Sequence, residues 1–299
     1  MNRFIGARVR KILRKIVGKA PAALADTPPF VSQRRELSKI SELKLPINNQ
    51  FIMARQKANT VEGMFPEFSM AVIDTLLSFQ SKNKVEGNIL EFGVYKGRSA
   101  AILGPHLAAT ERLVLVDIED YLDPKAIQGF LKATDFILTP TENFRSAYKS
   151  YSKSLRTFRF IHIDASHAYR ATFNEMKMAD ELLSDKGIIA LDDFTNLNYA
   201  QNIAAIFKYL YTTTTDLMIF LVTDQKAYLC RKADLGFFLE FILDNFIPEM
   251  RSREIEDCCL ARTDLDTEFS AYYARTRLPG EEGHFYGVDI YLNYINVPI

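Results

Sequence analysis

The sequence has little cysteine, no tryptophan and no long apolar run. Its three cysteines, Cys230, Cys258 and Cys259, are too few for a disulfide framework and lack the C-x-x-C spacing of a metal site. Reduced thiols are usual inside cells, so we expect a cytoplasmic protein. No stretch approaches the roughly 18 apolar residues of a membrane span. The N-terminus also lacks the apolar block of a secretory signal.

A net charge of either sign is also missing, because 37 basic and 37 acidic residues cancel. The distribution is uneven: residues 1–25 carry seven basic side chains and no acidic one, which leaves the remainder mildly acidic. An acidic body argues against nucleic acid as a partner. With 299 residues, 48% of them hydrophobic, the chain is long enough to bury a sizeable core.

The basic N-terminal segment has the pattern of an amphipathic helix. In "FIGARVRKILRKIV", residues 4–17, apolar side chains recur at helical spacing and cationic side chains fill much of the other face. The sequence leaves four interpretations open: contact of residues 1–19 with an anionic membrane such as the inner membrane surface, docking into a partner groove, organellar targeting, or a frayed and solvated leader with none of these roles. Pro21, Pro28 and Pro29 then indicate a linker.

From about residue 60, apolar strands alternate with helical patterns, which predicts a parallel sheet with helices on both faces. The expected strands are Asn88–Phe92, a run ending at Asp117, Phe136–Thr139, a run ending at Asp164, a run ending at Asp192, and two strands joined at Asp224–Gln225. The expected helices are Ser69–Gln80, Ser99–Ala109, Ala168–Leu183, Tyr199–Tyr211 and one in "LGFFLEFILDNF". The predicted parts are a leader (1–25), a linker with an N-terminal helical addition (26–59), a ligand-binding α/β domain (60–233) and a helical or irregular C-terminal addition (234–299).

The first strand leads into a glycine turn, "ILEFGVYKGRSAA", residues 89–101. Gly93 and Gly97 permit a tight turn and close approach of the backbone to a ligand. Ser99 is placed to cap the next helix. A nucleotide-like ligand at the carboxyl ends of the strands is the natural expectation for such a turn.

The acids around this turn favour a cationic adenosine ligand over a dinucleotide. Tyr95 interrupts the G-x-G-x-x-G spacing, and the carboxylate of Glu91 would repel a pyrophosphate. Asp117 ends the next strand, where a carboxylate grips ribose hydroxyls. S-adenosylmethionine combines a ribose with a positive charge. The predicted cofactor residues are therefore Glu91, Gly93, Tyr95, Gly97, Ser99 and Asp117.

These motifs, chained with "FIHIDASHAYRATFNEMKMADELLSDKGIIALDDF", resemble the class I S-adenosylmethionine-dependent methyltransferases over residues 60–232. The most similar branch is that of the macrocin-type sugar O-methyltransferases. The resemblance implies a Rossmann-like α/β fold with a seven-stranded, mostly parallel sheet whose last strand is inserted antiparallel. Tyr95 departs from the family's middle glycine.

Three acids, Asp164, Asp192 and Asp193, follow strands that the resemblance makes neighbours. Clustered carboxylates repel each other unless a cation joins them, and oxygen ligands select a hard divalent ion such as Mg²⁺. We therefore predict a metal at these acids, which would hold and acidify an acceptor hydroxyl. His167, at a helix start, is the predicted general base, with Asp164 as the second catalytic residue. His162 is expected to be a packed core residue.

The acceptor side is less defined by the sequence. Tyr169, Phe194, Asn196 and Tyr199 lie near the acids in the sequence, and Thr60 and Glu62 are placed to close over the cofactor. The predicted function is S-adenosylmethionine-dependent, metal-assisted O-methylation of a sugar or glycosylated small molecule. Two alternatives remain: a catalytically silent binding module in a polysaccharide-modifying assembly, and a nicotinamide-dependent oxidoreductase. The tyrosine-rich tail is a candidate for a homo-oligomer interface.

Overall fold

The computed structural model describes residues 32–36, 43–262, 271–276 and 294–298. The predicted basic leader and most of the tyrosine-rich tail lie outside these residues. None of the described helices is both long and apolar enough to cross a lipid bilayer.

A nine-stranded sheet organises the described chain, in the order β4-β3-β2-β5-β6-β8-β7-β10-β9. Its strands are β2 (Asn88–Phe92), β3 (Leu113–Asp117), β4 (Thr134–Leu138), β5 (Phe158–Ile163), β6 (Leu183–Leu191), β7 (Leu217–Val222), β8 (Ala227–Arg231), β9 (Cys258–Arg262) and β10 (Tyr272–Thr276). A separate antiparallel pair joins β1 (Ser32–Glu36) to β11 (Tyr294–Pro298).

The first seven strands of the large sheet reproduce the predicted fold class. Strands β2 to β6 pair in parallel, while β8 is antiparallel to both β6 and β7 and lies between them. This is the inserted antiparallel strand that the resemblance implies, so the predicted Rossmann-like α/β class is confirmed.

The strand count needs a correction, because two further strands extend the predicted seven. Strand β10 pairs in parallel with β7, and β9 pairs antiparallel with β10. Both come from the segment after residue 233, which was predicted to be helical or irregular. That segment also supplies α8 (Leu235–Asp244) and α9 (Phe246–Ser252). Its strands were missed because they have no clear alternation and join an existing edge.

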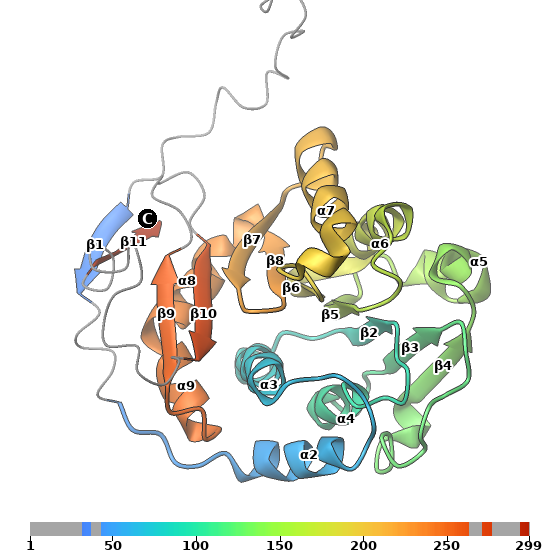
Figure 1. The fold of residues 1–299 in the computed structure, drawn as a ribbon, viewed down its shortest axis with the longest axis horizontal. Helices are drawn as coiled ribbons and strands as arrows, with labels where there is room; N and C mark the ends of the chain where they lie inside the picture. The colour runs from blue at the N-terminus through green and yellow to red at the C-terminus, as the bar shows by residue number, and fades with distance from the viewer. Residues whose placement is uncertain (1–31, 37–42, 263–270, 277–293, 299) are drawn as a thin grey trace, which may run out of the picture. The chain divides into compact units, whose positions relative to one another are not determined.

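Helices cover both faces of the sheet (Figure 1). On one face lie α3 (Glu67–Lys82) and α4 (Ala100–Leu103), with α2 (Asn49–Asn59) against α4. The other face carries α6 (Tyr169–Leu182) and α7 (Ala200–Thr212), while the short α5 (Phe144–Ala147) adds Phe144 to the same core. The predicted helix over Ser99–Ala109 is shorter than expected and tightens to a 3₁₀ turn at Gly104–His106. Pro105 explains the change, because proline cannot donate the helical hydrogen bond.

Strand alternation assigns each side chain to one face. Leu90, Phe92, Ile161 and Ile163 pack with Met176 of α6 in the apolar core. Their neighbours along the strands, Glu91 and His162, face the opposite side because successive strand residues alternate. The α3 face therefore contains a polar cluster among otherwise apolar positions, close to the ends of the strands.

Candidate active site

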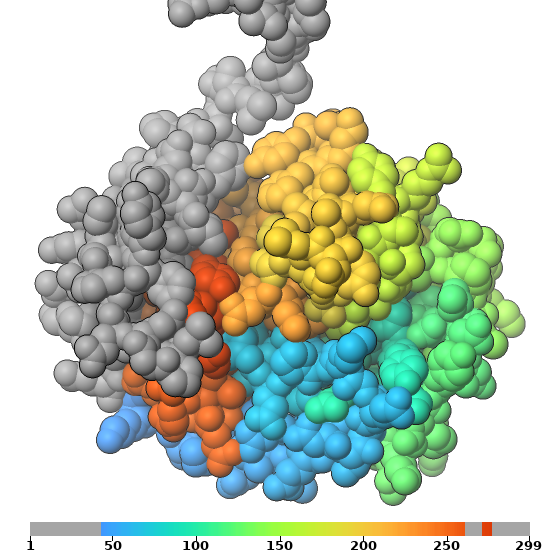
Figure 2. All heavy atoms as spheres, viewed as in Figure 1, coloured from blue at the N-terminus to red at the C-terminus, as the bar shows by residue number. Residues whose placement is uncertain are grey.

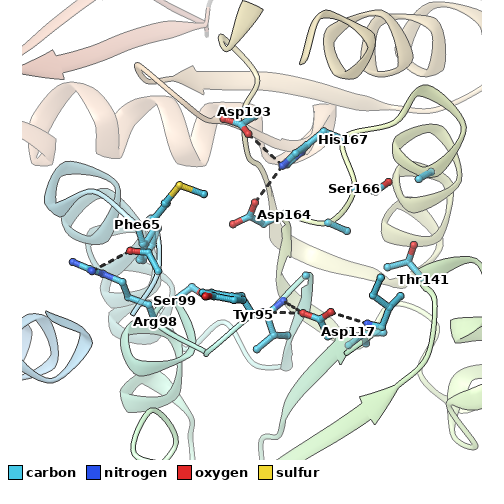
Figure 3. Close-up of a pocket in the computed structure, with 18 of the residues that line it drawn as sticks. Phe65, Tyr95, Arg98, Ser99, Asp117, Thr141, Asp164, Ser166, His167 and Asp193 are labelled. Carbon is cyan, nitrogen blue, oxygen red and sulfur yellow. Dashed lines mark hydrogen bonds and ion pairs between the residues drawn. The ribbon is translucent and has the colours of Figure 1, made fainter. Parts of the chain in front are cut away.

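A cleft of about 540 Å³ opens at the carboxyl ends of β2, β3, β5 and β6 (Figure 3). Parallel strands of an open α/β sheet present their carboxyl ends, and hence their ligand sites, at one edge. In the space-filling view of Figure 2, blue-to-cyan atoms near residues 50–80 lie next to yellow atoms near residue 200. The residues that line the cleft include Glu62, Gly63, Phe65, Gly93, Tyr95, Arg98, Ser99, Asp117, Glu142, Asp164, His167, Asp193 and Tyr199.

The glycine turn packs against the end of β5. Gly93 has φ +82°, and a Cβ built on it would lie 2.0 Å from the carbonyl oxygen of Asp164. Gly97 has φ +83°, and its Cβ would lie 2.7 Å from the Leu122 side chain. Glycine is therefore required at both positions by backbone conformation and by protein contacts. Gly93 lines the cleft and Gly97 does not.

Tyr95 adopts a backbone conformation that glycine usually occupies. Its φ of +49° lies in the left-handed region, which is uncommon for residues other than glycine. The Tyr95 hydroxyl donates to Glu62 Oε1 over 2.7 Å, and Lys96 forms an ion pair with the same carboxylate. Arg98 donates to the carbonyl of Gly63 over 3.1 Å. These contacts hold the segment before α3 against the cleft, where Glu62 was predicted to lie; Thr60 does not line the cleft.

Asp117 lines the cleft and also fixes the turn. Its Oδ2 accepts from the backbone N–H groups of Val94, at 2.7 Å, and Tyr95, at 2.8 Å. Its Oδ1 accepts from the N–H of Ile118 over 2.7 Å and that of Glu119 over 3.3 Å. A carboxylate offers about four acceptor positions. Ribose hydroxyls would therefore share these oxygens with the backbone.

Glu91 and Ser99 differ from their predicted arrangement. Glu91 is fully buried behind the cleft lining, and its Oε1 lies 2.7 Å from His162 Nδ1. The structure therefore places this carboxylate as the partner of a core histidine, because β2 and β5 pair Glu91 directly with His162. Ser99 lines the cleft but makes no capping hydrogen bond, since its backbone is already helical.

His167 lies between two of the predicted acids (Figure 3). Its Nε2 is 3.2 Å from Asp193 Oδ2 and 3.6 Å from Asp164 Oδ1. Asn196 donates from Nδ2 to the other oxygen of Asp193 over 3.1 Å. The ring of Tyr199 lies 4.7 Å from the imidazole, measured between centroids. The predicted catalytic residues are thus brought together at one end of the cleft.

Backbone strain is concentrated at this site. Of the seven described non-glycine residues with positive φ, three line the cleft: Tyr95, His167 and Asp193. Each such conformation costs about 1–3 kcal/mol and persists only where the surrounding structure imposes it. The geometry of the turn, the base and its acid is therefore held by the fold around them.

Burial changes the protonation of the two predicted catalytic groups. Burial lowers the pKa of His167 below its ordinary value of 6.5, and the charges of Asp193 and Asp192 only partly oppose this. A neutral imidazole is therefore favoured at neutral pH. Burial and the neighbouring charge of Asp192 raise the pKa of Asp164 well above its ordinary value. The site pairs a neutral base with a carboxyl group that retains a proton more readily than a free one.

The predicted metal ligands do not come together as an open site. Asp192 Oδ1 forms an ion pair with the ammonium group of Lys226, whose side chain is fully buried. Although burial opposes it, the Lys226 charge lowers the pKa of Asp192 well below its ordinary value. Asp193 faces His167 instead, and the atoms that do converge within 4.8 Å come from His162, Asp164 and Asp192. A lysine already supplies the charge that a metal was predicted to supply, so we derive no step through a metal ion.

Acidic side chains dominate the lining of the cleft. Five carboxyl-bearing residues line it: Glu62, Asp117, Glu142, Asp164 and Asp193. Arg98 is the one arginine or lysine among the lining residues, and it already donates hydrogen bonds to Gly63 and Asn59. Such a lining attracts a cationic ligand. Sequence reasoning missed Lys226, Phe65 and Arg98.

Comparison with known families identifies the domain that contains this site. Residues 90–194 match the family model of a methyltransferase domain. This match and the order of the central sheet identify a methyltransferase domain in the chain. The enzyme class predicted from the sequence, methyl transfer dependent on S-adenosylmethionine, is thereby confirmed, whereas the macrocin-type branch stays a prediction.

Solved structures with a similar course of the chain include several methyltransferases. The S-adenosylhomocysteine-bound methyltransferase PaMTH1 of Podospora anserina is 20% identical, with a TM-score of 0.44, covering 65% of this chain and 92% of that one. CalS11, a TDP-rhamnose 3'-O-methyltransferase of calicheamicin biosynthesis, is 18% identical, with a TM-score of 0.40 and coverage of 62% and 96%. The O-methyltransferase NovP is 14% identical, with a TM-score of 0.40 and coverage of 54% and 78%. No protein of curated function matches the sequence.

Proposed function

We propose that the chain is an S-adenosylmethionine-dependent O-methyltransferase acting on a hydroxyl of a sugar or glycosylated small molecule. The observation that carries the proposal is the acid-lined cleft, which joins the glycine turn at one end to His167 at the other. S-adenosylmethionine supplies an electrophilic methyl group on a sulfonium centre. Its positive charge suits the carboxylates, and its ribose suits the position of Asp117.

The reaction needs an acceptor oxygen, the methyl carbon and sulfur in line at short range. As the oxygen–carbon bond forms, the carbon–sulfur bond breaks and its electron pair stays on sulfur. The hydroxyl proton passes to the imidazole of His167, which burial keeps neutral and able to accept it. The resulting imidazolium is stabilised by Asp193, 3.2 Å away, whose other oxygen is held by Asn196.

An exposed aromatic side chain at the His167 end of the cleft supports a sugar acceptor. Tyr199 lines the cleft and is 41% exposed although its ring packs on His167, whereas Tyr169, 38% exposed at the start of α6, does not line the cleft. Flat aromatic faces pack against the apolar faces of sugar rings while leaving hydroxyl groups free. An acceptor stacked on Tyr199 would present a hydroxyl to His167.

Titration calorimetry with the purified protein tests the donor assignment. We expect S-adenosylmethionine to bind one equivalent per chain. S-adenosylhomocysteine, which lacks the sulfonium charge, is the matched control and should bind more weakly at low salt if the carboxylates recognise that charge. NADH should not bind. Binding of NADH without binding of S-adenosylmethionine would overturn the proposal, and a panel of glycosylated acceptors with radiolabelled donor then tests methyl transfer itself.

The rate of methyl transfer should fall at acid pH. Because burial lowers the pKa of His167 in the folded protein, the imidazole stays neutral down to below pH 6.5, and only then does protonation remove the base. Burial has the largest effect on this pKa; Asp193 and Asp192 raise it, and Lys226 and His162 lower it further. We expect kcat/KM to be flat above pH 6.5 with an acid limb below it, measured under initial-rate conditions. An acid limb centred above pH 6.5 would contradict the assignment of His167 as a base kept neutral by burial.

A further inference from the structure

A buried lysine lies at the acidic edge of the sheet, and it is not among the site residues predicted from the sequence. The Lys226 side chain is fully buried, and its ammonium group forms an ion pair with Asp192 Oδ1. The ring of Phe65 covers it, with the nitrogen 5.3 Å from the ring centroid. The centroid of the same ring lies 6.1 Å from that of the His162 imidazole, so one aromatic side chain lies next to both groups.

The topology of the sheet places the lysine there. Strand β8 runs antiparallel to β6, with Leu191 paired to Ala227, so β8 begins at the edge where β6 ends. The residue before β8 therefore stands beside the residue after β6, which are Lys226 and Asp192. Thr223 fixes the turn, because its N–H donates to the Lys226 carbonyl over 2.7 Å and its Oγ1 accepts from the Lys226 N–H over 3.1 Å.

We propose that Lys226 is the built-in cation of the acidic edge, taking the place of a divalent metal ion in positioning Asp192 and Asp164 for methyl transfer. The catalytic consequence of this inference rests on the proposed function. The absence of a metal ion can be tested without it, by metal binding and Tm. Lys226 is a positioning residue, because it acts through the two carboxyl groups. Methyl transfer by this chain then needs no added metal.

Geometry and charge make the lysine and a metal mutually exclusive. A magnesium ion bonds a carboxylate oxygen at about 2 Å, and Asp192 Oδ1 already contacts the ammonium group. Two cations would then share one carboxylate next to the ring of Phe65. A buried charge without a partner is strongly unfavourable, so Lys226 and Asp192 each require the other.

The other two acids, Asp193 and Asp164, have different surroundings. Asp193 is engaged by His167 and by the amide of Asn196. The Asp164 side chain, 27% exposed, is the most exposed of the three and lines the cleft next to His167. Without a Lewis acid to acidify the acceptor hydroxyl, removal of its proton falls to the base. The neutral His167 beside Asp164 is suited to this task.

Metal binding by four purified proteins tests the proposal: wild type, Lys226→Met, Asp192→Asn and the double variant. Each is titrated calorimetrically with MgCl₂ and MnCl₂, and its Tm is measured with and without millimolar metal. We expect no metal binding and no Tm shift for wild type. The Lys226→Met protein leaves Asp192 without a counter-charge, so it should melt at a lower temperature and regain Tm when metal is added. The double variant carries neither charge and should show no such metal-dependent gain.

Wild type that binds Mg²⁺, with loss of that binding in Asp192→Asn, would overturn the proposal. If Lys226→Met does not fold, the wild-type and Asp192→Asn titrations still decide the question. The rate of methyl transfer by wild type should be unchanged in excess chelator, and a loss that Mg²⁺ restores would also contradict the inference. The calorimetric and melting results do not depend on activity. A protein that binds neither metal nor S-adenosylmethionine therefore refutes the proposed function, and with it the catalytic consequence, while leaving the replacement of a metal ion by Lys226 intact.

Discussion

Replacement of His167 by asparagine should lower kcat by about 10²- to 10⁴-fold, the usual contribution of a general base. Asparagine is the suitable replacement because His167 has a φ of +53°, a conformation that asparagine tolerates better than most residues. Its amide cannot take the hydroxyl proton. Affinity for S-adenosylmethionine should change little, because the donor is held from the other end of the cleft.

His106 provides the matched control for this substitution. It pairs with Asp74 over 2.7 Å in a buried network with Arg253, and it does not line the cleft. His106→Asn should lower Tm but leave kcat of the folded enzyme unchanged. His167→Asn should lower kcat but leave Tm nearly unchanged. If His167→Asn retains a wild-type kcat while a neighbouring carboxyl variant does not, the base is that carboxyl group and the assignment to His167 is wrong.

Replacement of Gly93 by alanine should cost the enzyme much of its stability and its donor binding. A Cβ at this position would lie 2.0 Å from the carbonyl oxygen of Asp164 and 2.5 Å from its carbonyl carbon, both backbone atoms that cannot rotate away. Overpacking of this kind costs about 1–3 kcal/mol. The left-handed backbone at φ +82° adds about 1–2 kcal/mol for a residue with a Cβ. Movement of the turn would also displace the backbone that Asp117 holds.

Gly236 is the control, because replacement by alanine at that position should raise the stability of the protein and not lower it. It lies in α8, and a Cβ built on it meets no atom within 4 Å. Alanine within a helix is more favourable than glycine by about 0.5–1 kcal/mol. Differential scanning calorimetry should therefore show Gly93→Ala melting well below wild type and Gly236→Ala melting at or above it. Equal Tm values for the two variants would mean that the turn moves freely away from β5.

Local sequence patterns were sufficient to place most elements of the sheet. Strand β2 was predicted at its observed bounds, and the strands before Asp117, Asp164 and Asp192 end where the apolar runs meet an acid. Apolar side chains with helical spacing located α3, α6 and α7 to within two residues. These patterns work because each element must bury one face against its neighbours. Strands β9 and β10 were missed because an added edge strand leaves little periodic signal.

The candidate site was predictable in its positions but not in its pairings. Sequence reasoning put acids, the glycine turn and His167 at one edge, because parallel strands end together. It assigned Glu91 to the cofactor, whereas register sets that side chain against His162, behind the cleft. Lys226 left a readable signal, since it is a lone lysine directly before an apolar strand in a hairpin. Its partner follows only from knowing that β8 lies next to β6.

The order of strands and helices, the turn that requires glycine and the acids at the strand ends were determined by the sequence alone, since these depend on contacts within a few residues. Only the tertiary structure decided which charged groups form ion pairs with each other. Lys226 and Asp192 are far apart in the chain and meet because an antiparallel strand is inserted beside a parallel one. Burial then makes their ion pair obligatory, because a charge removed from water must have a partner.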